Sequence, residues 1–336
     1  MLRKRWTKLP KFYAYVAEKD GDNFSFGKKE LDLIDLPEGE VTIRVRYSSV
    51  NFKDGLASTP NGRVLRSYPM VPGIDLAGEV VACSNASFQE GQPVLVTGYG
   101  LGVSHFGGFA EYARVPANWV VPLPQGLRLR DAMVIGTAGF TAGLAVKRME
   151  ENGLRPGQGP VLVVGATGGV GSIAVAVLAN SGYEVTASTG KQSEVDYLKS
   201  LGASQVLSRE EVSQESSRAL EKELWAGAID PVGGKTLAYL LRTTKYGGSV
   251  ASMGNTGGPE LNTTVFPFIL RGVNLLGIDS VNCPMDSRLQ VWDRLAASLS
   301  ASQLDAMAVE TPFDELPEAL SAILKGGVRG RVVITL

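Results

Sequence analysis

Residues 159–191 read GPVLVVGATGGVGSIAVAVLANSGYEVTASTGK, and this stretch decides the fold. An apolar run at 161–164 enters a cluster of glycines. An alanine-rich apolar segment at 172–180 follows, and then a second β-rich run at 183–188. This order predicts a strand, a turn, a helix and a second strand.

The glycines of this turn have the spacing GxxGxxG. Gly165 suits the tight turn out of the strand, Gly168 and Gly169 let backbone N–H groups approach a phosphate, and Gly171 lets the helix lie close to the sheet. Glycine-rich turns also serve packing alone. Between a strand and a helix, in a unit of about 30 residues, they predict dinucleotide binding.

The second strand of such a fold ends in an acid when the cofactor is NAD, because a carboxylate binds the ribose 2′-hydroxyl. Here the strand leads into Ser188, Thr189, Gly190 and Lys191, with no acid. Hydroxyl and ammonium groups suit a 2′-phosphate, and Arg209 follows the third apolar strand. The sequence therefore favours NADP over NAD, with solvated surface cations as the alternative interpretation of Lys191 and Arg209.

The bulk properties of the chain exclude several classes of protein. Its 336 residues predict two domains, and 44% hydrophobic with 20% charged residues describe a globular protein. A net charge of −1 gives no reason to expect binding to nucleic acid or to a membrane. The basic residues 1–11 precede no apolar core, so no secretory signal is predicted. Two cysteines make no disulfide framework and favour a cytoplasmic location.

The pattern along the chain predicts two domains of different kinds. From residue 12 to 136, short apolar runs alternate with glycine and proline turns, as in a small, mainly antiparallel β-rich domain. Residues 137–309 alternate strands with helices and predict a parallel, doubly wound α/β sheet. A final strand at 330–335 comes too late for that sheet, so residues 310–336 are expected to complete the first domain.

Metal catalysis and serine hydrolysis can be tested by counting residues. A structural zinc site needs four ligands and a catalytic one about three, whereas the chain offers Cys83, Cys283 and one histidine, His105, far apart in sequence. No GxSxG motif surrounds any serine. We therefore expect no metal, and hydride transfer by a bound cofactor is the remaining chemistry.

Several motifs together resemble a known family. They are NFKD at 51–54, PGIDLAGEV at 72–80, GGFAEYARV at 107–115, IGTAGFTAG at 135–143, the glycine turn and YGGSVASMG at 246–254. These look like a zinc-independent medium-chain dehydrogenase/reductase of the quinone-oxidoreductase type. WAGAIDPVG at 225–233 and TTVFPFILRGVNLLGIDS at 263–280 are similar to its acrylyl-CoA reductase branch.

The resemblance implies a GroES-like catalytic domain, a Rossmann domain that binds NADPH, and a homodimer in which residues 273–278 form an edge strand. It assigns Asn51 and Phe52 to the catalytic side, although relatives tend to have Tyr where Phe52 stands. The implied cofactor-binding residues are Gly165, Thr167, Gly168, Gly169, Val170 and Gly171 at the turn; Thr189, Gly190, Lys191 and Arg209 at the 2′-phosphate; and Phe52, Asn255, Ile269 and Ser280 at the nicotinamide.

Three functions follow as hypotheses. The first is NADPH-dependent reduction of the C=C bond of acrylyl-CoA, with Asn51 or a backbone N–H stabilising the enolate oxygen and with Lys53, Arg63 and Arg66 as candidates for CoA phosphates. The second is a quinone or enone reductase. The third is a nucleotide-binding protein without turnover. Each site residue also has a purely structural interpretation, which we favour for Asp75 as a buried, hydrogen-bonded carboxylate.

Overall fold

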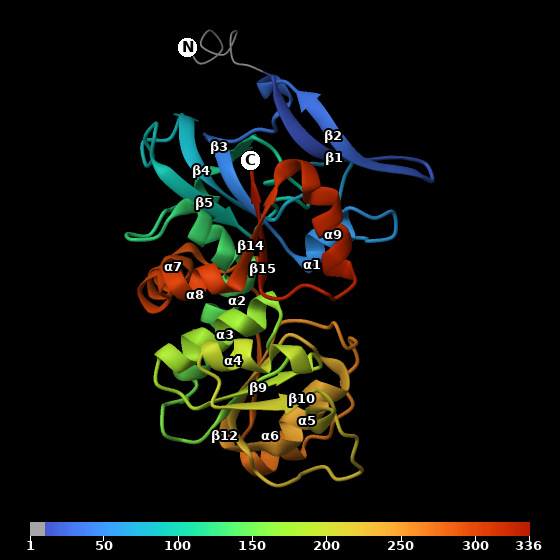
Figure 1. Cartoon of the computed structure of the whole chain (residues 1–336), viewed down its shortest axis with the longest axis vertical. Helices are drawn as coiled ribbons and strands as arrows, with labels where there is room; N and C mark the ends of the chain where they lie inside the picture. Colours follow the sequence, from blue (N-terminus) through green and yellow to red (C-terminus); the bar gives the residue numbers. More distant parts are fainter. Residues whose placement is uncertain (1–10) are drawn as a thin grey trace. The chain divides into compact units, whose positions relative to one another are not determined.

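The computed structural model describes residues 11–336, so the basic tail at 1–10 lies outside the described part. The chain forms two compact units (Figure 1). The described part of the first unit runs from residue 11 to Thr137 and adds Val281–Leu289 and Ala308–Leu336. The second comprises Ala138–Ser280 and Gln290–Met307. Val281–Leu289 therefore differs from our sequence-based division, which put it in the second domain.

The first unit is built on a seven-stranded sheet of order β14-β15-β3-β4-β5-β7, with β6 paired to β3. Its strands are β3 (Val41–Val50), β4 (Asp75–Cys83), β5 (Pro93–Thr97), β6 (Tyr112–Val115), β7 (Val121–Pro122), β14 (Ala308–Pro312) and β15 (Arg331–Thr335). A separate hairpin pairs β1 (Phe12–Asp20) with β2 (Asn23–Leu31). Most pairs are antiparallel, and β14 with β15 is parallel.

Two short helices of the first unit pack on each other, α1 (Phe52–Ala57) and α9 (Leu316–Leu324). Figure 1 shows them side by side next to the sheet. A Cβ at Gly55 of α1 would lie 2.9 Å from the side chains of Ile323 and Leu324, so glycine permits this close approach. Two apolar clusters, one around Phe12 and Phe109 and one around Ile43 and Leu76, fill the core of the unit.

The second unit is a six-stranded, entirely parallel sheet of order β10-β9-β8-β11-β12-β13. This is the dinucleotide-binding strand order, and it confirms the predicted doubly wound Rossmann fold. The strands are β8 (Val161–Val163), β9 (Val185–Thr189), β10 (Gln205–Ser208), β11 (Trp225–Asp230), β12 (Thr244–Ser252) and β13 (Asn274–Gly277).

Four helices of the second unit lie between consecutive strands, and two more follow the last strand. They are α3 (Gly169–Asn180), α4 (Val195–Ser200), α5 (Gly234–Thr243), α6 (Phe266–Arg271) and α8 (Ala301–Met307), and α7 (Met285–Ser298) begins in the first unit. Figure 1 shows α3 and α4 on one side of the strands and α5 and α6 on the other. The apolar core on the α5 and α6 side includes Leu162, Ala228 and Val250 from the strands.

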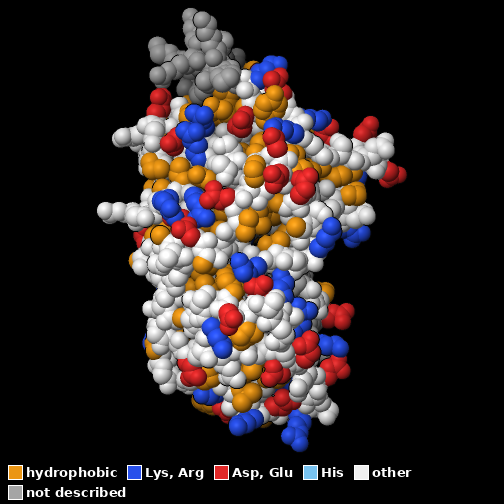
Figure 2. Space-filling view, in the orientation of Figure 1, with side chains coloured by type: hydrophobic (Ala, Val, Ile, Leu, Met, Phe, Trp, Pro, Cys, Tyr) orange, Lys and Arg blue, Asp and Glu red, His pale blue; other side chains and the backbone are white. Residues whose placement is uncertain are grey.

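Helix α2 (Leu129–Glu151) connects the two units and bends at Gly136, which has φ +50° and ψ −161°. In the described part of the chain it is the one helix long and apolar enough to cross a membrane, but 83% of its most apolar window is buried in the protein. It therefore reads as a core helix. On the face shown in Figure 2, basic and acidic side chains are mixed, in keeping with the net charge of −1.

Candidate active site

The glycine turn of the second unit joins β8 to α3. Gly165 has φ +59°, a left-handed conformation that favours glycine. A Cβ at Gly171 would lie 2.4 Å from the carbonyl oxygen of Gly165, so only glycine lets α3 begin this close to the turn. Gly168 is the N-cap of α3, and a Cβ there would meet no atom nearer than 3.4 Å. The turn is therefore open on its outer side.

The first residues of α3, Gly169 and Val170, are partly exposed. The first N–H groups of a helix have no partner within the helix, and together with the helix dipole they form an anion site. The buried Thr167 precedes them, and its hydroxyl lies 3.3 Å from that of Thr189. The turn and the end of β9 therefore meet, as dinucleotide binding requires.

The end of β9 brings together all four residues expected at the 2′-phosphate. The Thr189 hydroxyl accepts a hydrogen bond from the backbone N–H of Lys191 (3.0 Å), and the Thr189 carbonyl accepts one from the N–H of Arg209 (3.1 Å). A Cβ at Gly190 would lie 2.8 Å from Nη2 of Arg209. The guanidinium thus lies directly against Gly190, and no acid occurs between residues 185 and 193.

Of the four residues expected at the nicotinamide, three belong to the second unit, and two of these follow neighbouring parallel strands. Asn255 comes after β12 and Ser280 after β13, so both lie at the carboxyl edge of the sheet, where ligands of such folds bind. Ile269 lies instead within α6 and is 67% exposed. Its role at the nicotinamide therefore stays a prediction.

The first unit contains a buried polar network around Asp75, at the start of β4. The carboxylate of Asp75 accepts hydrogen bonds from the hydroxyl of Ser49 (2.6 Å), from Nδ2 of Asn51 (2.8 Å) and from the N–H and hydroxyl of Thr137 (3.0 and 2.5 Å). Arg331, at the start of β15, has Nη2 3.6 Å from the same carboxylate. Asp75 is thus a buried, hydrogen-bonded carboxylate.

Asn51 follows β3 as the N-cap of α1, and three ionisable side chains orient it. Its Nδ2 donates to Asp75 and also to Asp54 (3.2 Å), and its Oδ1 accepts from Nη1 of Arg331 (3.1 Å). Both amide hydrogens are therefore in use. This geometry argues against our expectation that the Asn51 amide donates to a substrate oxygen and leaves backbone N–H groups for that task.

Asp54 lies in α1 and is completely buried. Its carboxylate accepts hydrogen bonds from the N–H groups of Asn51 (2.9 Å) and Ile74 (3.0 Å). Burial, and next the negative charge of Asp75, raise the pKa of Asp54 to about 7 from its usual 3.8. Phe52 begins the same helix and is 44% exposed, so its ring is available to a ligand.

Sequence analysis missed Arg331, Ser49 and Thr137 as members of this network. Arg331 is only 3% exposed and also donates from Nε to the carbonyl of Val134. The available signal was an arginine at the first position of an otherwise apolar last strand. A buried arginine needs a buried acid, and Asp75 opens another strand of the same unit.

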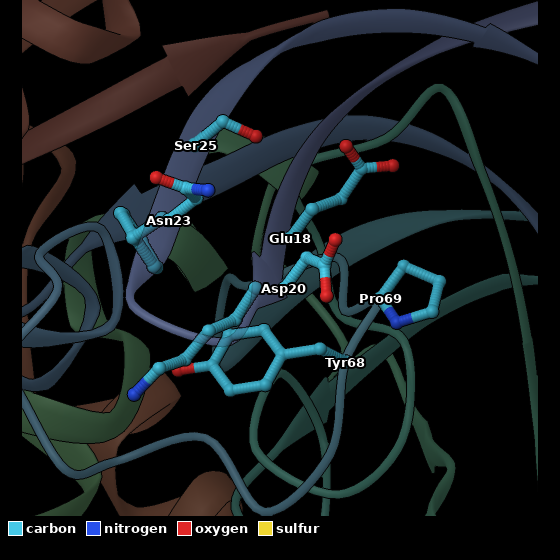
Figure 3. A pocket seen from close by; sticks show the side chains of 8 residues that line it. Glu18, Asp20, Asn23, Ser25, Tyr68 and Pro69 are labelled. Atoms are coloured by element: carbon cyan, nitrogen blue, oxygen red, sulfur yellow. The ribbon is translucent and has the colours of Figure 1, made fainter.

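A surface hollow of about 400 Å³ in the first unit is a separate feature. It is lined by the ends of β1 and β2 and by the turn at Tyr68 and Pro69. Figure 3 shows Glu18 and Asp20 between Tyr68 and the strand that carries Asn23 and Ser25. None of the expected site residues lines it.

Comparison with known proteins decides the family. Residues 37–125 match the alcohol dehydrogenase GroES-like domain and residues 169–297 the zinc-binding dehydrogenase domain. The putative quinone oxidoreductase YhfP of Bacillus subtilis is 54% identical over 326 residues, which cover 97% of this chain and 99% of that protein. The chain belongs to the medium-chain dehydrogenase/reductase family.

Other members of the family extend the comparison. Acrylyl-CoA reductase AcuI of Ruegeria pomeroyi is 52% identical over 328 residues, or 96% of this chain and 98% of that protein. The crystal structure of Escherichia coli YhdH with bound NADPH has a TM-score of 0.92 and 49% identity, and that of B. subtilis YhfP with NAD has 0.95 and 53%. The YhdH match covers 96% of this chain and 99% of the YhdH chain, and the YhfP match covers 98% of this chain and 100% of the YhfP chain.

The family assignment makes this chain an oxidoreductase and confirms the predicted fold class. One matched domain is described as zinc-binding. Between residues 11 and 336, however, no three His, Cys, Asp or Glu side chains form a group that could hold a metal ion.

Proposed function

We propose that this enzyme uses NADPH to reduce the C=C bond of acrylyl-CoA, giving propionyl-CoA. The observation that carries the cofactor choice is the end of β9, where Thr189, Lys191 and Arg209 gather without an acid. Cationic and hydroxyl groups bind a 2′-phosphate, which a carboxylate would repel. The substrate choice is supported by the relative named acrylyl-CoA reductase, at 52% identity.

The residues of the second unit fit this cofactor. We propose that Thr167, Gly168, Gly169 and Val170 hold the pyrophosphate at the start of α3, with Gly165 and Gly171 shaping the turn. Thr189, Gly190, Lys191 and Arg209 would hold the 2′-phosphate, and Asn255 and Ser280 the nicotinamide end. Ile269 of α6, which is largely exposed, stays a candidate at the same end.

The reaction consumes acrylyl-CoA, NADPH and a proton and yields propionyl-CoA and NADP⁺. When bound, NADPH would supply the hydride for the β-carbon of the thioester, and the α-carbon would take its proton from water or from a residue of the enzyme. On the first unit we keep Asn51 and Phe52 as candidate residues. Asn51 is not proposed to donate a hydrogen bond to the substrate, because its amide hydrogens already bind Asp54 and Asp75. Phe52 offers an aromatic ring to a ligand but has no hydroxyl that could transfer a proton.

The test is to incubate the purified protein with NADPH and acrylyl-CoA and to follow cofactor oxidation and propionyl-CoA formation. Parallel reactions contain 1,4-benzoquinone or no acceptor. Propionyl-CoA formed in step with NADPH oxidation supports the proposal. Oxidation with the quinone alone would refute it.

Quinone reduction is the second candidate, and one observation favours it. The B. subtilis relative at 54% identity is named a putative quinone oxidoreductase. The same benzoquinone reaction measures this activity directly.

We further propose that the enzyme is a homodimer. In the described sheet of the second unit, β13 is an end strand paired only with β12. Apolar side chains are exposed on β13, namely Leu275 (38%), and on α6, the helix that precedes it in the chain, namely Ile269 (67%) and Leu270 (58%). A second copy pairing along β13 would cover both the open strand edge and these side chains.

We also propose a cytoplasmic location. Cys83 and Cys283 are both free thiols, as expected in a reducing compartment.

A further inference from the structure

The surface of the first unit around α1 is formed by three segments with a common charge pattern. Residues 55–74, 91–110 and 319–330 contain no Asp or Glu, in a chain that has 34 such residues. Asp54, the acid just before the first segment, is completely buried. Any charge that this surface presents is therefore positive.

Direct contacts bring these segments together. Gly55 of α1 packs on Leu324 at the end of α9, and a Cβ at Gly62 would overlap the carbonyl of Leu56. Further along, the N–H of Arg66 donates to the carbonyl of Val103 (2.9 Å). A Cβ at Gly102 would lie 2.7 Å from Gly73. The loop after α1 thus runs from α1 across to the loop at residues 98–108.

The cations of interest are Lys53 in α1, directly before the first segment, Arg63 and Arg66 in the loop that follows, and Lys325 after α9. Arg329 on the third segment already has an interaction partner. Arg63, Arg66 and Lys325 are exposed and Lys53 is half-buried. Across residues 11–336, none of the four has a salt bridge or a side-chain hydrogen bond.

Two acids on neighbouring elements are already paired with lysines. Asp314 pairs with Lys28 and belongs to the turn before α9, at the opposite end of that helix from Lys325. Glu18, in the hollow beside Tyr68, pairs with Lys29 at 2.6 Å. The four cations are therefore not neutralised by the described protein.

We propose that Lys53, Arg63, Arg66 and Lys325 form a binding surface for the phosphate groups of the CoA moiety, so that it is the nucleotide end of the substrate that selects a CoA thioester. CoA carries a 3′-phosphate and a diphosphate, and exposed arginines bind such groups with charge-assisted, bidentate hydrogen bonds. The surface has the opposite charge to the ligand and needs no rearrangement of existing ion pairs. This inference rests on the proposed function.

The experiment compares two thioesters that share the reacting group. Acrylyl-CoA carries all the phosphates and acrylyl-pantetheine carries none. In the double variant Arg63→Ala/Arg66→Ala, we expect KM for acrylyl-CoA to rise about tenfold, as loss of a charged hydrogen bond predicts. The kcat for acrylyl-CoA and the KM for acrylyl-pantetheine should not change. Lys325→Ala should also raise KM for acrylyl-CoA, by a smaller factor, and leave the other two constants unchanged.

A matched control is Arg44→Ala, which removes an exposed arginine from β3 of the same unit. It should leave both KM values unchanged. Added salt should raise the wild-type KM for acrylyl-CoA and not for acrylyl-pantetheine, because salt screens exposed charges. Equal changes with both thioesters in the double variant, or no change with acrylyl-CoA, would overturn the proposal.

Binding of coenzyme A itself, measured by calorimetry, separates this proposal from the proposed function. Binding that is lost in Arg63→Ala/Arg66→Ala supports the phosphate surface even if the wild-type enzyme reduces neither thioester. Reduction of acrylyl-CoA by a double variant with unchanged KM and unchanged CoA binding would refute the surface while the proposed function stands.

Discussion

The side chain of Asn51 is held between two carboxylates and a guanidinium, which fixes the direction of its amide. Arg331 and Asp75 form a pair that is almost completely excluded from water. Removing one partner of such a pair leaves an uncompensated buried charge, which costs far more than the pair itself contributes. A single substitution in the network should therefore be strongly destabilising. The intact network keeps Asn51, and the chain that leads into Phe52, in one conformation.

Replacing Lys191 by Ala tests the cofactor assignment. We expect KM for NADPH to rise about tenfold, because one charge-assisted contact to the 2′-phosphate is lost. The KM for NADH should stay within about twofold, since NADH has no phosphate for Lys191 to bind. Steady-state kinetics with both cofactors measures the effect.

Lys199→Ala provides the control, because Lys199 is an exposed lysine of α4 in the same unit. It should alter neither KM. An equal effect of Lys191→Ala on NADPH and NADH would disprove the phosphate contact.

The pKa of Asp54 gives a prediction about pH. Because the pKa is about 7 in the folded protein and 3.8 is usual, the folded state holds a proton that the unfolded chain has released between these values. The stabilising effect of this proton is complete below about pH 4 and is lost as the pH rises to 7. The free energy of unfolding should therefore fall by up to about 1.4 kcal/mol per pH unit in this window.

Urea denaturation of wild type and Asp54→Asn at pH 5, 6, 7 and 8 tests this. The variant cannot titrate at position 54, so wild type should lose stability relative to the variant as the pH rises from 5 to 7. Glu38→Gln, at an exposed acid, serves as the control. A difference between wild type and Asp54→Asn that stays constant with pH contradicts the prediction.

Sequence alone predicted those site residues whose roles depend on neighbours in the chain. The glycines at 165–171 and the residues at 188–191 belong to one local motif, and the structure brings them together with Arg209. Arg331 was missed because its partners lie up to 282 residues away, and no local pattern reports such a contact. The role of Ile269 stays a prediction, because likeness to a motif does not say on which face of a short helix a residue lies.

At the scale of single elements, the bend in α2 allows the buried network to form. Gly136 has a positive φ, and a Cβ there would lie 2.6 Å from Oδ2 of Asp75 and 2.7 Å from Nη2 of Arg331. The bend also aims the N–H of Thr137 at the Asp75 carboxylate. The sequence does not reveal this bend, because it depends on what packs against the glycine.

Gly136→Ala should therefore destabilise the protein strongly. We expect a loss on the order of 3 kcal/mol in the free energy of unfolding, from backbone strain and from displacement of the Asp75–Arg331 pair. Urea denaturation gives the value.

Gly153→Ala separates the two causes. Gly153 also has a positive φ (+93°), but a Cβ there would meet nothing within 4 Å. This variant should lose only about 1 kcal/mol, the cost of the backbone conformation. Similar losses of unfolding free energy in both variants would show that the Cβ at position 136 does not displace the Asp75–Arg331 pair.

At the scale of the whole molecule, the parallel, doubly wound sheet of the second unit could be predicted from the alternation of strands and helices. The first unit was less predictable. Its sheet contains β14 and β15 from the end of the sequence, and the position of β15 between β14 and β3 depends on long-range pairing. The quaternary structure depends on exposed surfaces, which the sequence pattern alone does not reveal.

The proposed dimer leads to the last prediction. Ile269→Asp and Leu275→Asp should each convert a dimer into monomers in sedimentation velocity experiments, because a buried, unpaired carboxylate opposes association. Val309→Asp is the control, since Val309 is 59% exposed on β14, an end strand of the other sheet. Dissociation by Val309→Asp, with Ile269→Asp and Leu275→Asp still dimeric, would place the interface elsewhere.

The position of β15 has a consequence for synthesis on the ribosome. Val332–Thr335 pair with Tyr47–Val50. One edge of β3 therefore stays unpaired during synthesis until β15, nearly 300 residues later in the chain, has been translated. All strands of the second unit are made before β15 emerges. The nascent chain should therefore complete its nucleotide-binding sheet first and carry an unfinished first unit, with an open strand edge available to chaperones, until the last residues leave the exit tunnel.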